Sequence, residues 1–580
     1  MTSNLSAASL SRWTSTLPIA LCGLLLTFAV ALLLRDGWIL SQGSLTGSDP
    51  PAHFVSGVMV SDYLHHAFGT NPMDFAESFY VRYPKVAIGH WPPGYYLLQA
   101  GWYSLFGAHV LSARLLSASM AALLALTLVH SLRRAYGYAI ALGSAAVLLA
   151  LPLLQQVAWA VMSDLLTGLF VWFALRALAA MLDCARGWRS QWRTAARLVL
   201  WSVLALLSKG TAWALLPWLL LTPLAARRTF VYFDGAYWAA VALILVLGAP
   251  FYLLVRASAT GYPVDLTHLV SGGVSWLERL TPLAPLPGLA PAVVLVLAAL
   301  GALDAAHCRW WRRDSDANAG TTLALAAAVW IAAQSAFFFV LPLTPEPRAW
   351  LPSVAPLLVL SARGLGCLRD ALLVHSRHAV HIVPLAIAAA LLGIRPMPQN
   401  PIDGYRAAAD AIPYPPLGAL TLVSSDPSGE GAFIVERLIR DPAHAGVVLR
   451  GDPMLSASNW SGTVSKPLFD NAEAVRSHLV GLQVEYVVID GSADNSRERQ
   501  LLRAAVEGDS AVFHPLGHFA VSDRMHGRLG DIAVYHNPHA GRATEVRVHL
   551  GLERGRRALV YRWPCARASG SAGADCNAAR

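Results

Sequence analysis

One carboxylate stands where it could act on a substrate arriving from a lipid. Asp49 lies just beyond the apolar run Leu17 to Leu34, and Pro50 and Pro51 follow it. Proline rings restrict the backbone, so the side chain before them can be aimed in a fixed direction. A carboxylate placed in this way can accept the proton of a hydroxyl group that attacks as a nucleophile. The alternative is a solvated loop aspartate.

A second carboxylate opens another apolar run. Asp164 follows Met162 and Ser163 at the start of the run 165–182, and the topology derived below places it on the same side as Asp49. An aspartate at this position also satisfies the free N–H groups of a helix N-terminus. Capping and a polar role toward a substrate are compatible, so both readings stay open.

Three cations stand at the edges of apolar runs on that side. They are Arg114, Lys209 and Arg348. Each taken singly can be an interfacial anchor. Guanidinium groups, however, bind phosphate through paired hydrogen bonds. Together with two carboxylates, these cations form the set that a site for a lipid-linked phosphate leaving group needs.

An aromatic segment completes the candidate chemistry. Lys85 and His90 are able to pair with a phosphate, and Tyr95 and Tyr96 suit stacking on a sugar ring. The alternative is an interfacial helix whose long side chains reach toward the headgroups. No metal-ligand spacing accompanies His90, so we predict no metal site there.

The composition of the chain predicts that these residues belong to a membrane protein with several transmembrane segments. Of 580 residues, 55% are apolar and 14% are charged, against about 25% charged in an average soluble domain. These values exclude a purely soluble enzyme, a disordered chain and a fibrous repeat. The net charge of +9 is typical of basic cytoplasmic loops, so we predict no nucleic-acid partner.

The apolar runs predict about eleven transmembrane helices. The first run is longer than a signal-peptide core and no cleavage site follows it, so we interpret it as an uncleaved anchor. The expected spans are 17–34, 115–132, 138–154, 165–182, 195–207, 210–225, 234–254, 290–304, 321–341, 350–362 and 378–394.

The distribution of basic residues supports this count. With the N-terminus in the cytoplasm, 16 of the 25 Lys and Arg residues up to position 395 fall on the cytoplasmic side, as the positive-inside rule expects. One long span over 195–225 would bury Lys209 at mid-bilayer, which costs about 2.5–3.5 kcal/mol. We therefore predict two short spans that meet at Ser208-Lys209-Gly210, with everything after residue 395 outside.

The composition changes near residue 400. We predict a transmembrane domain over 1–395 that includes a long first outer loop at 35–111, a small soluble α/β domain over 400–560, and a flexible tail over 561–580. Cys565 and Cys576 either pair in that tail or stay free thiols. The elements expected in the α/β domain are strands at 419–424, 446–449 and 484–490 and helices at 431–439, 472–482 and 497–506.

These motifs, in this order, resemble the polyprenyl-phosphate-dependent membrane glycosyltransferases. That superfamily of GT-C fold includes the dolichyl-phosphate-mannose protein mannosyltransferases and the bacterial aminoarabinose transferase acting on lipid A. The chain departs from the family's motifs where Pro50 follows Asp49, where Trp91 is inserted, and where Ala349 follows Arg348. The stretches that carry the likeness are Gly47-Ser48-Asp49 with Ala52-His53, His90-Trp91-Pro92-Pro93-Gly94-Tyr95-Tyr96, Ser112-Ala113-Arg114-Leu115-Leu116-Ser117, Leu207-Ser208-Lys209-Gly210 and Pro347-Arg348-Ala349-Trp350-Leu351-Pro352.

The resemblance implies transfer of a sugar from a polyprenyl-phosphate donor to an acceptor hydroxyl, with inversion at the anomeric carbon. Asp49 would be the general base and Asp164 a second polar partner, while Arg114, Lys209, Arg348 and more weakly Lys85 would bind the departing lipid phosphate. The acceptor would be a glycan, a lipid or a protein. The mechanism requires no cofactor, although a divalent metal is not excluded. The implied location is the inner membrane, with the C-terminal domain in the periplasm.

Two rival readings remain. Charged residues at the edge of a helix bundle also mark the path of a transporter or flippase of lipid-linked glycan. The clustering of titratable residues on one face and the absence of a visible repeat favour the enzyme. In the third reading, the chain is a non-catalytic scaffold and Asp49 is merely solvated.

Overall fold

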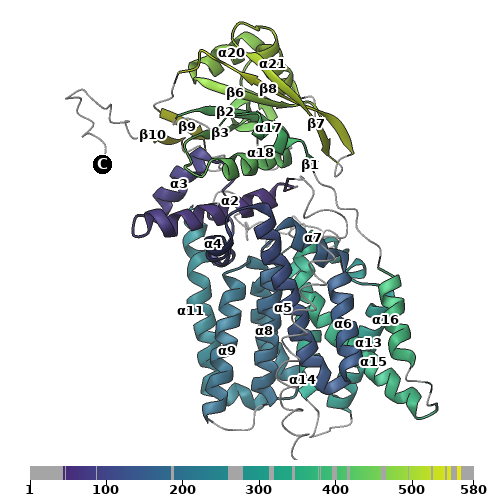
Figure 1. Ribbon diagram of the computed structural model, residues 1–580. Coiled ribbons are helices and arrows are strands. Elements are labelled where there is room, and N and C mark those ends of the chain that lie inside the picture. The colour runs from purple at the N-terminus through teal and green to yellow at the C-terminus, as the bar shows by residue number, and fades with distance from the viewer. Residues whose placement is uncertain are drawn as a thin grey trace, which may run out of the picture. The chain divides into compact units, whose positions relative to one another are not determined.

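The computed structural model divides the chain into two compact units (Figure 1). The helical unit comprises residues 1–41 and 89–399, and the sheet unit comprises residues 42–88 and 400–580. The predicted first span, Cys565 and Cys576 lie outside the described residues. The structure describes residues 44–45, 47–86, 88–183, 188–258, 279–311, 319–341, 346–376, 378, 381–394, 402–413, 418–458, 465–493, 496–523, 527–541, 545–549 and 558–562.

The helical unit consists of long apolar helices joined by short 3₁₀ turns. The 3₁₀ turns are η2 (Gly210–Ala214), η3 (Thr229–Phe233), η4 (Thr281–Leu283), η5 (Leu286–Gly288) and η6 (Pro347–Ser353). The α-helices are α4 (Gly94–Phe106), α5 (Val110–Tyr136), α6 (Tyr138–Ala150), α7 (Pro152–Ala160), α8 (Asp164–Asp183), α9 (Trp188–Leu206), α10 (Leu215–Ala225), α11 (Gly235–Ser258), α13 (Ala292–Trp310), α14 (Ala319–Val340), α15 (Val354–Leu373) and α16 (Ile382–Leu392).

The membrane character that the composition predicts is confirmed. In the described part of the chain, six helical segments are long and apolar enough to cross a membrane, and the pair α6 and α7, bent by 54°, would make a seventh. The segments Gly210–Ala225 and Ile382–Leu392 are apolar but shorter. Helix α9 carries three arginines in its N-terminal half, which lowers its mean hydropathy. The total of eleven spans stays a prediction.

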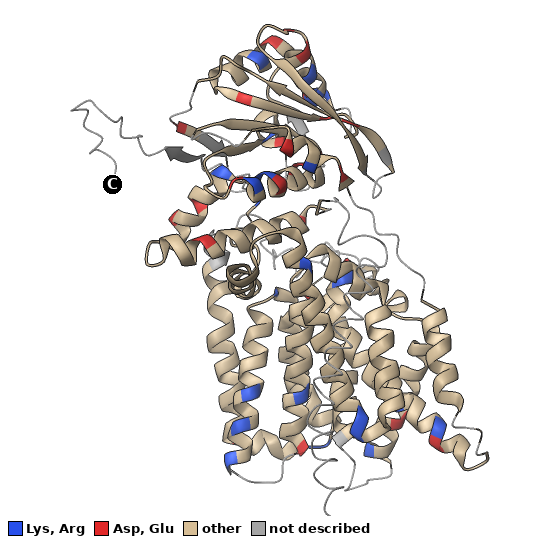
Figure 2. Cartoon of the chain, in the orientation of Figure 1, with Lys and Arg blue, Asp and Glu red and all other residues tan. Residues whose placement is uncertain are grey.

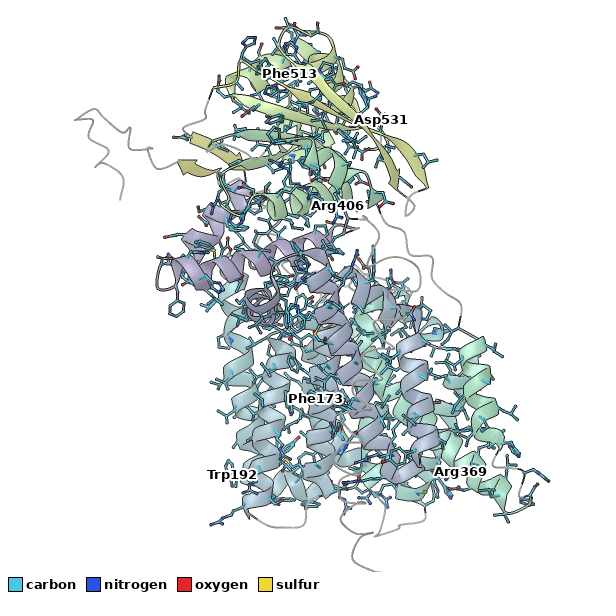
Figure 3. All side chains as sticks on the ribbon, in the orientation of Figure 1. Phe173, Trp192, Arg369, Arg406, Phe513 and Asp531 are labelled. Carbon is cyan, nitrogen blue, oxygen red and sulfur yellow. The ribbon has the colours of Figure 1, made fainter. Side chains whose placement is uncertain are left out.

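Basic residues gather at one end of the helical unit (Figure 2). At this end Arg228 lies 3.8 Å from Asp183, Arg309 donates to the carbonyl of Ala226, and Arg363 pairs with Asp304 at 2.8 Å. Figure 3 shows Trp192 and Arg369 at the same end. This grouping is what the positive-inside rule expects of a cytoplasmic face, and the orientation itself stays a prediction.

Helices α13 and α15 approach each other closely because glycines face each other. A Cβ atom on Gly301 would lie 2.0 Å from the carbonyl oxygen of Leu360, and one on Gly364 would lie 2.0 Å from that of Leu297. Small residues let helix backbones touch in an apolar medium, where packing rather than water exclusion drives association. Any side chain larger than hydrogen at either position would separate the two helices.

The sheet unit contains a mixed six-stranded sheet in the order β1-β7-β8-β6-β2-β3. Strand β2 pairs in parallel with β3 and β6, while β8 pairs antiparallel with β6 and β7. The three predicted strands correspond to β2, β3 and β6. The strands are β1 (Ile402–Asp403), β2 (Leu420–Ser424), β3 (Val447–Arg450), β4 (Ser456–Ser458), β5 (Ser465–Pro467), β6 (Val484–Asp490), β7 (His514–Asp523), β8 (Arg528–His536), β9 (Glu545–His549) and β10 (Ala558–Arg562).

Parallel strands need crossover connections, and helices provide them here. The predicted helices at 431–439, 472–482 and 497–506 correspond to α18, α20 and α21. Most of the sheet's apolar core comes from β2, β3, β6 and the helices on it. The helices of the sheet unit are α2 (Asp49–Asp62), the π-helix η1 (Tyr63–Ala67), α3 (Pro72–Arg82), α17 (Tyr405–Asp410), α18 (Pro427–Arg440), α19 (Gly451–Leu455), α20 (Ala472–Gly481) and α21 (Arg497–Glu507).

Part of the first predicted outer loop folds with the C-terminal sheet. Figure 1 shows the purple helices α2 and α3 beside the green α18 and the strands. Val81, which is 1% exposed, belongs to the apolar core of the sheet. The hydroxyl of Tyr83 donates to Asp441 at 2.7 Å. The segment that begins with Asp49 is therefore built on residues hundreds of positions further along the chain.

Candidate functional site

The helical unit has a break where the sequence predicts one. Helix α9 ends at Leu206, and Lys209 stands before the 3₁₀ turn η2. A break leaves helix carbonyls without their usual partners. Here the hydroxyl of Tyr252 donates to the carbonyl of Leu206 at 2.5 Å, and the N–H of Gly94 donates to that of Leu207 at 2.8 Å. The carbonyls of Leu206 and Leu207 at the break thus both have hydrogen-bond partners.

Gly94 explains how the aromatic segment reaches this break. A Cβ atom at Gly94 would lie 2.7 Å from the carbonyl oxygen of Leu207, so only glycine allows the hydrogen bond between the two backbones. Helix α4 begins at Gly94 and places Tyr95 and Tyr96 next, at 0% and 4% exposure. The hydroxyl of Tyr95 lies near Ser117 and the carboxylate of Asp164.

Lys209 and Asp164 form an ion pair. The Nζ atom of Lys209 lies 2.5 Å from Oδ1 of Asp164. Asp164 is the first residue of α8 and is fully buried, while the Lys209 side chain is 15% exposed. Among the described residues, Oδ2 of Asp164 has no hydrogen-bond partner. The structure therefore brings together two predicted site residues that stand 45 positions apart.

Arg348 is held beside the same helix start. It lies in η6, which packs on the first turns of α8. Its Nη1 atom lies 3.4 Å from the sulfur of Met162, and its Nε atom lies 2.6 Å from Glu346. The amide of Gln334 fixes η6 by donating to the carbonyl of Ala349 at 2.8 Å. The guanidinium thus contacts Met162, which precedes Asp164 by two positions in the sequence.

Arg114 and His90 also belong to the helical unit. In the sequence, His90 precedes α4 and Arg114 follows it. Arg114, in the second turn of α5, is 1% exposed, and its guanidinium lies 4.5 Å from the ring centroid of Trp159. Such a contact stabilises a cation that has lost water. The ring of His90 is perpendicular to that of Trp91 at a centroid distance of 4.5 Å. Ser117, beside Tyr95, follows Arg114 by one turn of α5.

Sequence reasoning missed several residues that shape this site. Met162 and Trp159 contact predicted cations, and Tyr252 satisfies the broken helix. Nothing in the local pattern distinguishes them from other apolar or aromatic residues of a span. Only Tyr252 could have been found from the sequence. Its hydroxyl lies within an apolar helix and needs a hydrogen-bond partner, and the predicted helix break supplies unpaired carbonyls.

Asp49 lies in the sheet unit. It is the half-buried first residue of α2, and Pro50 and Pro51 are buried directly after it. Gly47 has a φ of +87°, a left-handed conformation that turns the chain into the helix. That Asp49 works together with Lys209, Arg114 and Arg348 stays a prediction.

Lys85 is the neighbour of Asp49 in the sheet unit. The side chain is buried, and its Nζ atom donates to the carbonyl of Pro427 at 3.0 Å and lies 3.4 Å from the hydroxyl of Ser48. Burial and the nearby Arg450 lower the pKa of Lys85 to about 7, against the opposing effect of Glu430, Asp49 and Asp426. The ammonium is therefore close to its titration point at neutral pH.

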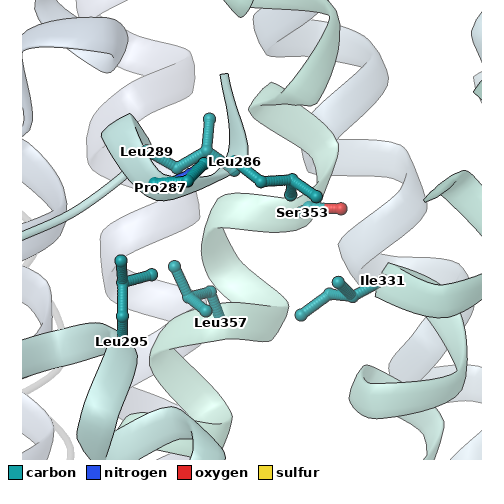
Figure 4. Close-up of a pocket in the computed structure, with 7 residues that line it drawn as sticks. All are labelled: Leu286, Pro287, Leu289, Leu295, Ile331, Ser353 and Leu357. Atoms are coloured by element: carbon teal, nitrogen blue, oxygen red, sulfur yellow. The ribbon is translucent and has the colours of Figure 1, made fainter. Parts of the chain in front are cut away.

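An apolar pocket of about 270 Å³ lies beside η6 (Figure 4). Ser353 is its polar member, and that hydroxyl donates to Gln334 at 2.5 Å. The pocket suits a hydrocarbon group rather than a sugar. Its lining residues are Leu286, Pro287, Leu289, Leu295, Ile331, Ser353 and Leu357.

Comparison with known proteins identifies the fold. No protein-family model and no curated protein matches the sequence. The Archaeoglobus fulgidus oligosaccharyltransferase crystallised with Zn and sulfate matches at 16% identity, over 89% of this chain and 73% of its own, with a TM-score of 0.52. Its complex with an inhibitory peptide and a dolichol-phosphate, named AglB, matches at 15% identity, over 91% and 75%, with a TM-score of 0.50.

A third solved structure is ArnT from Cupriavidus metallidurans bound to undecaprenyl phosphate. It matches at 16% identity over 90% of this chain and 98% of its own, with a TM-score of 0.49. The matches to the archaeal enzyme show that this chain has the GT-C fold. The resemblance expected from the motifs is confirmed at the level of the fold.

Proposed function

We propose that the chain is an integral membrane glycosyltransferase. It moves a sugar from a polyprenyl-phosphate donor, of the undecaprenyl-phosphate type, to an acceptor hydroxyl on the outer face of the inner membrane. The observation that carries the proposal is the ion pair of Lys209 and Asp164 at a built helix break, with Arg348 beside the same helix start. Charged residues within a membrane-spanning bundle are rare and mark substrate or ion sites, so an ion pair held at a helix break supports a functional site there.

The proposed reaction is a displacement at the anomeric carbon. The acceptor oxygen attacks that carbon while its proton passes to the carboxylate of Asp49. The bond from the anomeric carbon to the phosphate oxygen breaks, and the electron pair leaves with the polyprenyl phosphate. Attack from the side opposite the phosphate inverts the configuration.

The cations of the helical unit stabilise the leaving group. Lys209, Arg348 and Arg114 bind the phosphate as its negative charge develops, which is where preorganised charge lowers a barrier most effectively. Asp164 orients the ammonium of Lys209 through their 2.5 Å contact. His90 also binds the phosphate, whereas the partners of Lys85, Pro427 and Ser48, favour a different role for that residue.

The aromatic and apolar surfaces serve the uncharged parts of the donor. Tyr95 and Tyr96, next to the break, contact the sugar. The pocket beside η6 accommodates a stretch of the isoprenoid chain. The described residues contain no group of three His, Cys, Asp or Glu side chains placed to hold a metal.

A strain that lacks this protein tests the proposal. Mass spectrometry of its lipid-linked sugars and envelope glycans should show an accumulated carrier sugar and a missing decoration. Wild-type protein and an Asp74→Asn variant, which alters an exposed carboxylate of α3, should both restore the decoration. Asp49→Asn should not, although it inserts in the membrane normally.

A second step separates transfer from transport. The lipid-linked sugar extracted from the deletion strain is offered to purified protein in detergent, where no gradient exists, together with the undecorated envelope fraction of the same strain as acceptor. Turnover of that sugar supports the transferase. Complementation by Asp49→Asn, or accumulation of the donor with no transfer in detergent, would overturn the proposal in favour of a flippase or a scaffold.

A further inference from the structure

The turn that carries Asp49 is packed against the first turns of α18. A Cβ atom on Gly431 would lie 2.9 Å from Cε of Lys85 and 3.0 Å from Cβ and Cγ of Pro51. These distances are shorter than ordinary carbon contacts, so any side chain at Gly431 would displace its neighbours. Gly431 thus permits a contact that joins Lys85, the start of α2 and the C-terminal sheet.

Lys85 fastens this contact with hydrogen bonds. Its ammonium donates to the carbonyl of Pro427, at the start of α18, and reaches the hydroxyl of Ser48, directly before Asp49. An ammonium has three protons to donate, and two are directed at these oxygens. The side chain is 7% exposed, and both of these oxygens belong to its own chain.

Burial and Arg450 lower the pKa of Lys85 to about 7, and three carboxylates oppose that shift. Glu430 of α18, one of the three, is paired with Arg450 at the end of β3 at 2.6 Å. Asp426, the N-cap of α18, accepts a hydrogen bond from the N–H of Gly429 at 2.8 Å. Its negative charge raises the pKa of Lys85. Asp49 of α2 also raises the pKa of Lys85.

We propose that Lys85 is a positioning residue that holds the Asp49 turn against α18, and that the C-terminal sheet domain is thereby a working part of the catalytic apparatus. The inference rests on the proposed function, because it assigns a task to Lys85 and to the domain in that reaction. The sequence suggests that Lys85 binds the phosphate, and the positioning role proposed here takes the place of that assignment. Asp49 touches the reacting atoms, and Lys85 acts through it.

A single methyl group in the C-terminal domain tests the contact without altering a charge. Gly431→Ala should shift Lys85 and Pro51 and lower the turnover of the lipid-linked sugar extracted from the deletion strain by about ten- to a hundredfold, since small misplacements of reacting groups have effects of that size. Its affinity for undecaprenyl phosphate, used as a probe of the phosphate site, should not change. The matched control is Gly481→Ala, because a Cβ atom there has no neighbour within 4 Å; this variant should behave as wild type.

Lys85→Met tests the residue itself through the pH profile. In the wild type, kcat should fall as pH rises through about 7, because the ammonium form of Lys85 exists below its pKa and is lost above it. Lys85→Met should have a low kcat at every pH, without this alkaline limb, and an unchanged affinity for undecaprenyl phosphate. A role in general stability alone would leave the limb in place.

The outcomes separate the two proposals. If Asp49→Asn is inactive while Gly431→Ala keeps wild-type turnover, the positioning role is wrong and the proposed function stands. If Lys85→Met weakens undecaprenyl phosphate binding and keeps its kcat, Lys85 is a phosphate ligand and the inference is overturned. If Asp49→Asn retains turnover, the proposed function itself fails.

Discussion

Lys209 and Asp49 carry the opposite charges of the proposed reaction, and the chain holds them by different means. Lys209 sits at a break between two helical segments and is paired with Asp164, 45 residues away. Asp49 stands on a turn that packs against α18, and Lys85 bonds to Pro427 of that helix across 342 residues of sequence. In the proposed reaction, the residues assigned to the phosphate are thus held within the helical unit, and the residue assigned as the base is held by packing within the sheet unit.

Substitutions in the helical unit and at the Asp49 turn should therefore have different effects. The ion pair of Lys209 and Asp164 in the helical unit is buried, so breaking that pair should affect stability and lipid-phosphate binding together. The Asp49 turn depends on packing against the sheet, so damage there should affect turnover while leaving lipid-phosphate binding intact. The following variants test that division.

The largest expected effect follows from removing Lys209. Lys209→Met leaves the fully buried carboxylate of Asp164 without its cation, which costs about 3–5 kcal/mol of stability. Thermal unfolding of the purified protein should show this loss, and binding of undecaprenyl phosphate should fail.

A double variant separates the two effects of that change. Lys209→Met combined with Asp164→Asn removes both charges and should recover much of the stability without recovering binding. Recovery of binding in the double variant would show that Lys209 only compensates Asp164.

A smaller effect is expected in the sheet unit. Val81→Ala deletes two buried methyl groups from the core of the sheet, although residue 81 belongs to the first loop, and should destabilise that core by about 2 kcal/mol. Hydrogen exchange in β6 should accelerate. Met73→Ala on the same helix α3, where the side chain is 42% exposed, should leave the exchange unchanged. Equal exchange in both variants would mean that the loop does not stabilise the sheet.

The smallest effect is expected at Arg348. Arg348→Lys keeps the charge but loses the planar fork that binds phosphate, and should weaken undecaprenyl phosphate binding about tenfold, or about 1.4 kcal/mol. Stability should not change, because the side chain is 20% exposed. Arg189→Ala, at the exposed start of α9, is the control and should bind normally. Normal binding by Arg348→Lys would remove Arg348 from the phosphate site.

Much of the helical half was predictable from the sequence. The cost of a charge at mid-bilayer predicts the break at Lys209, and the break is present. The helices and strands that match the predictions are those with strong hydrophobic periodicity, because that periodicity depends on the secondary structure of neighbouring residues in the sequence. The ordered motifs predict the fold that the solved structures confirm.

The remainder depends on contacts that no local pattern records. Tyr83 bonds to Asp441 across 358 residues, and nothing near either residue predicts the other. Lys85 resembles an interfacial cation in sequence, and only the three-dimensional contact with Pro427 shows that it faces the chain itself. The proposed domain boundaries along the sequence stay a prediction, whereas the compact unit joins residues 42–88 with 400–580.

The most direct test of the central claim measures turnover and binding in the same preparation of Asp49→Asn. The account predicts that turnover of the extracted lipid-linked sugar falls by about 10²- to 10⁴-fold, as expected for the loss of a general base, while undecaprenyl phosphate binds as in the wild type. Turnover close to that of the wild type would contradict the account.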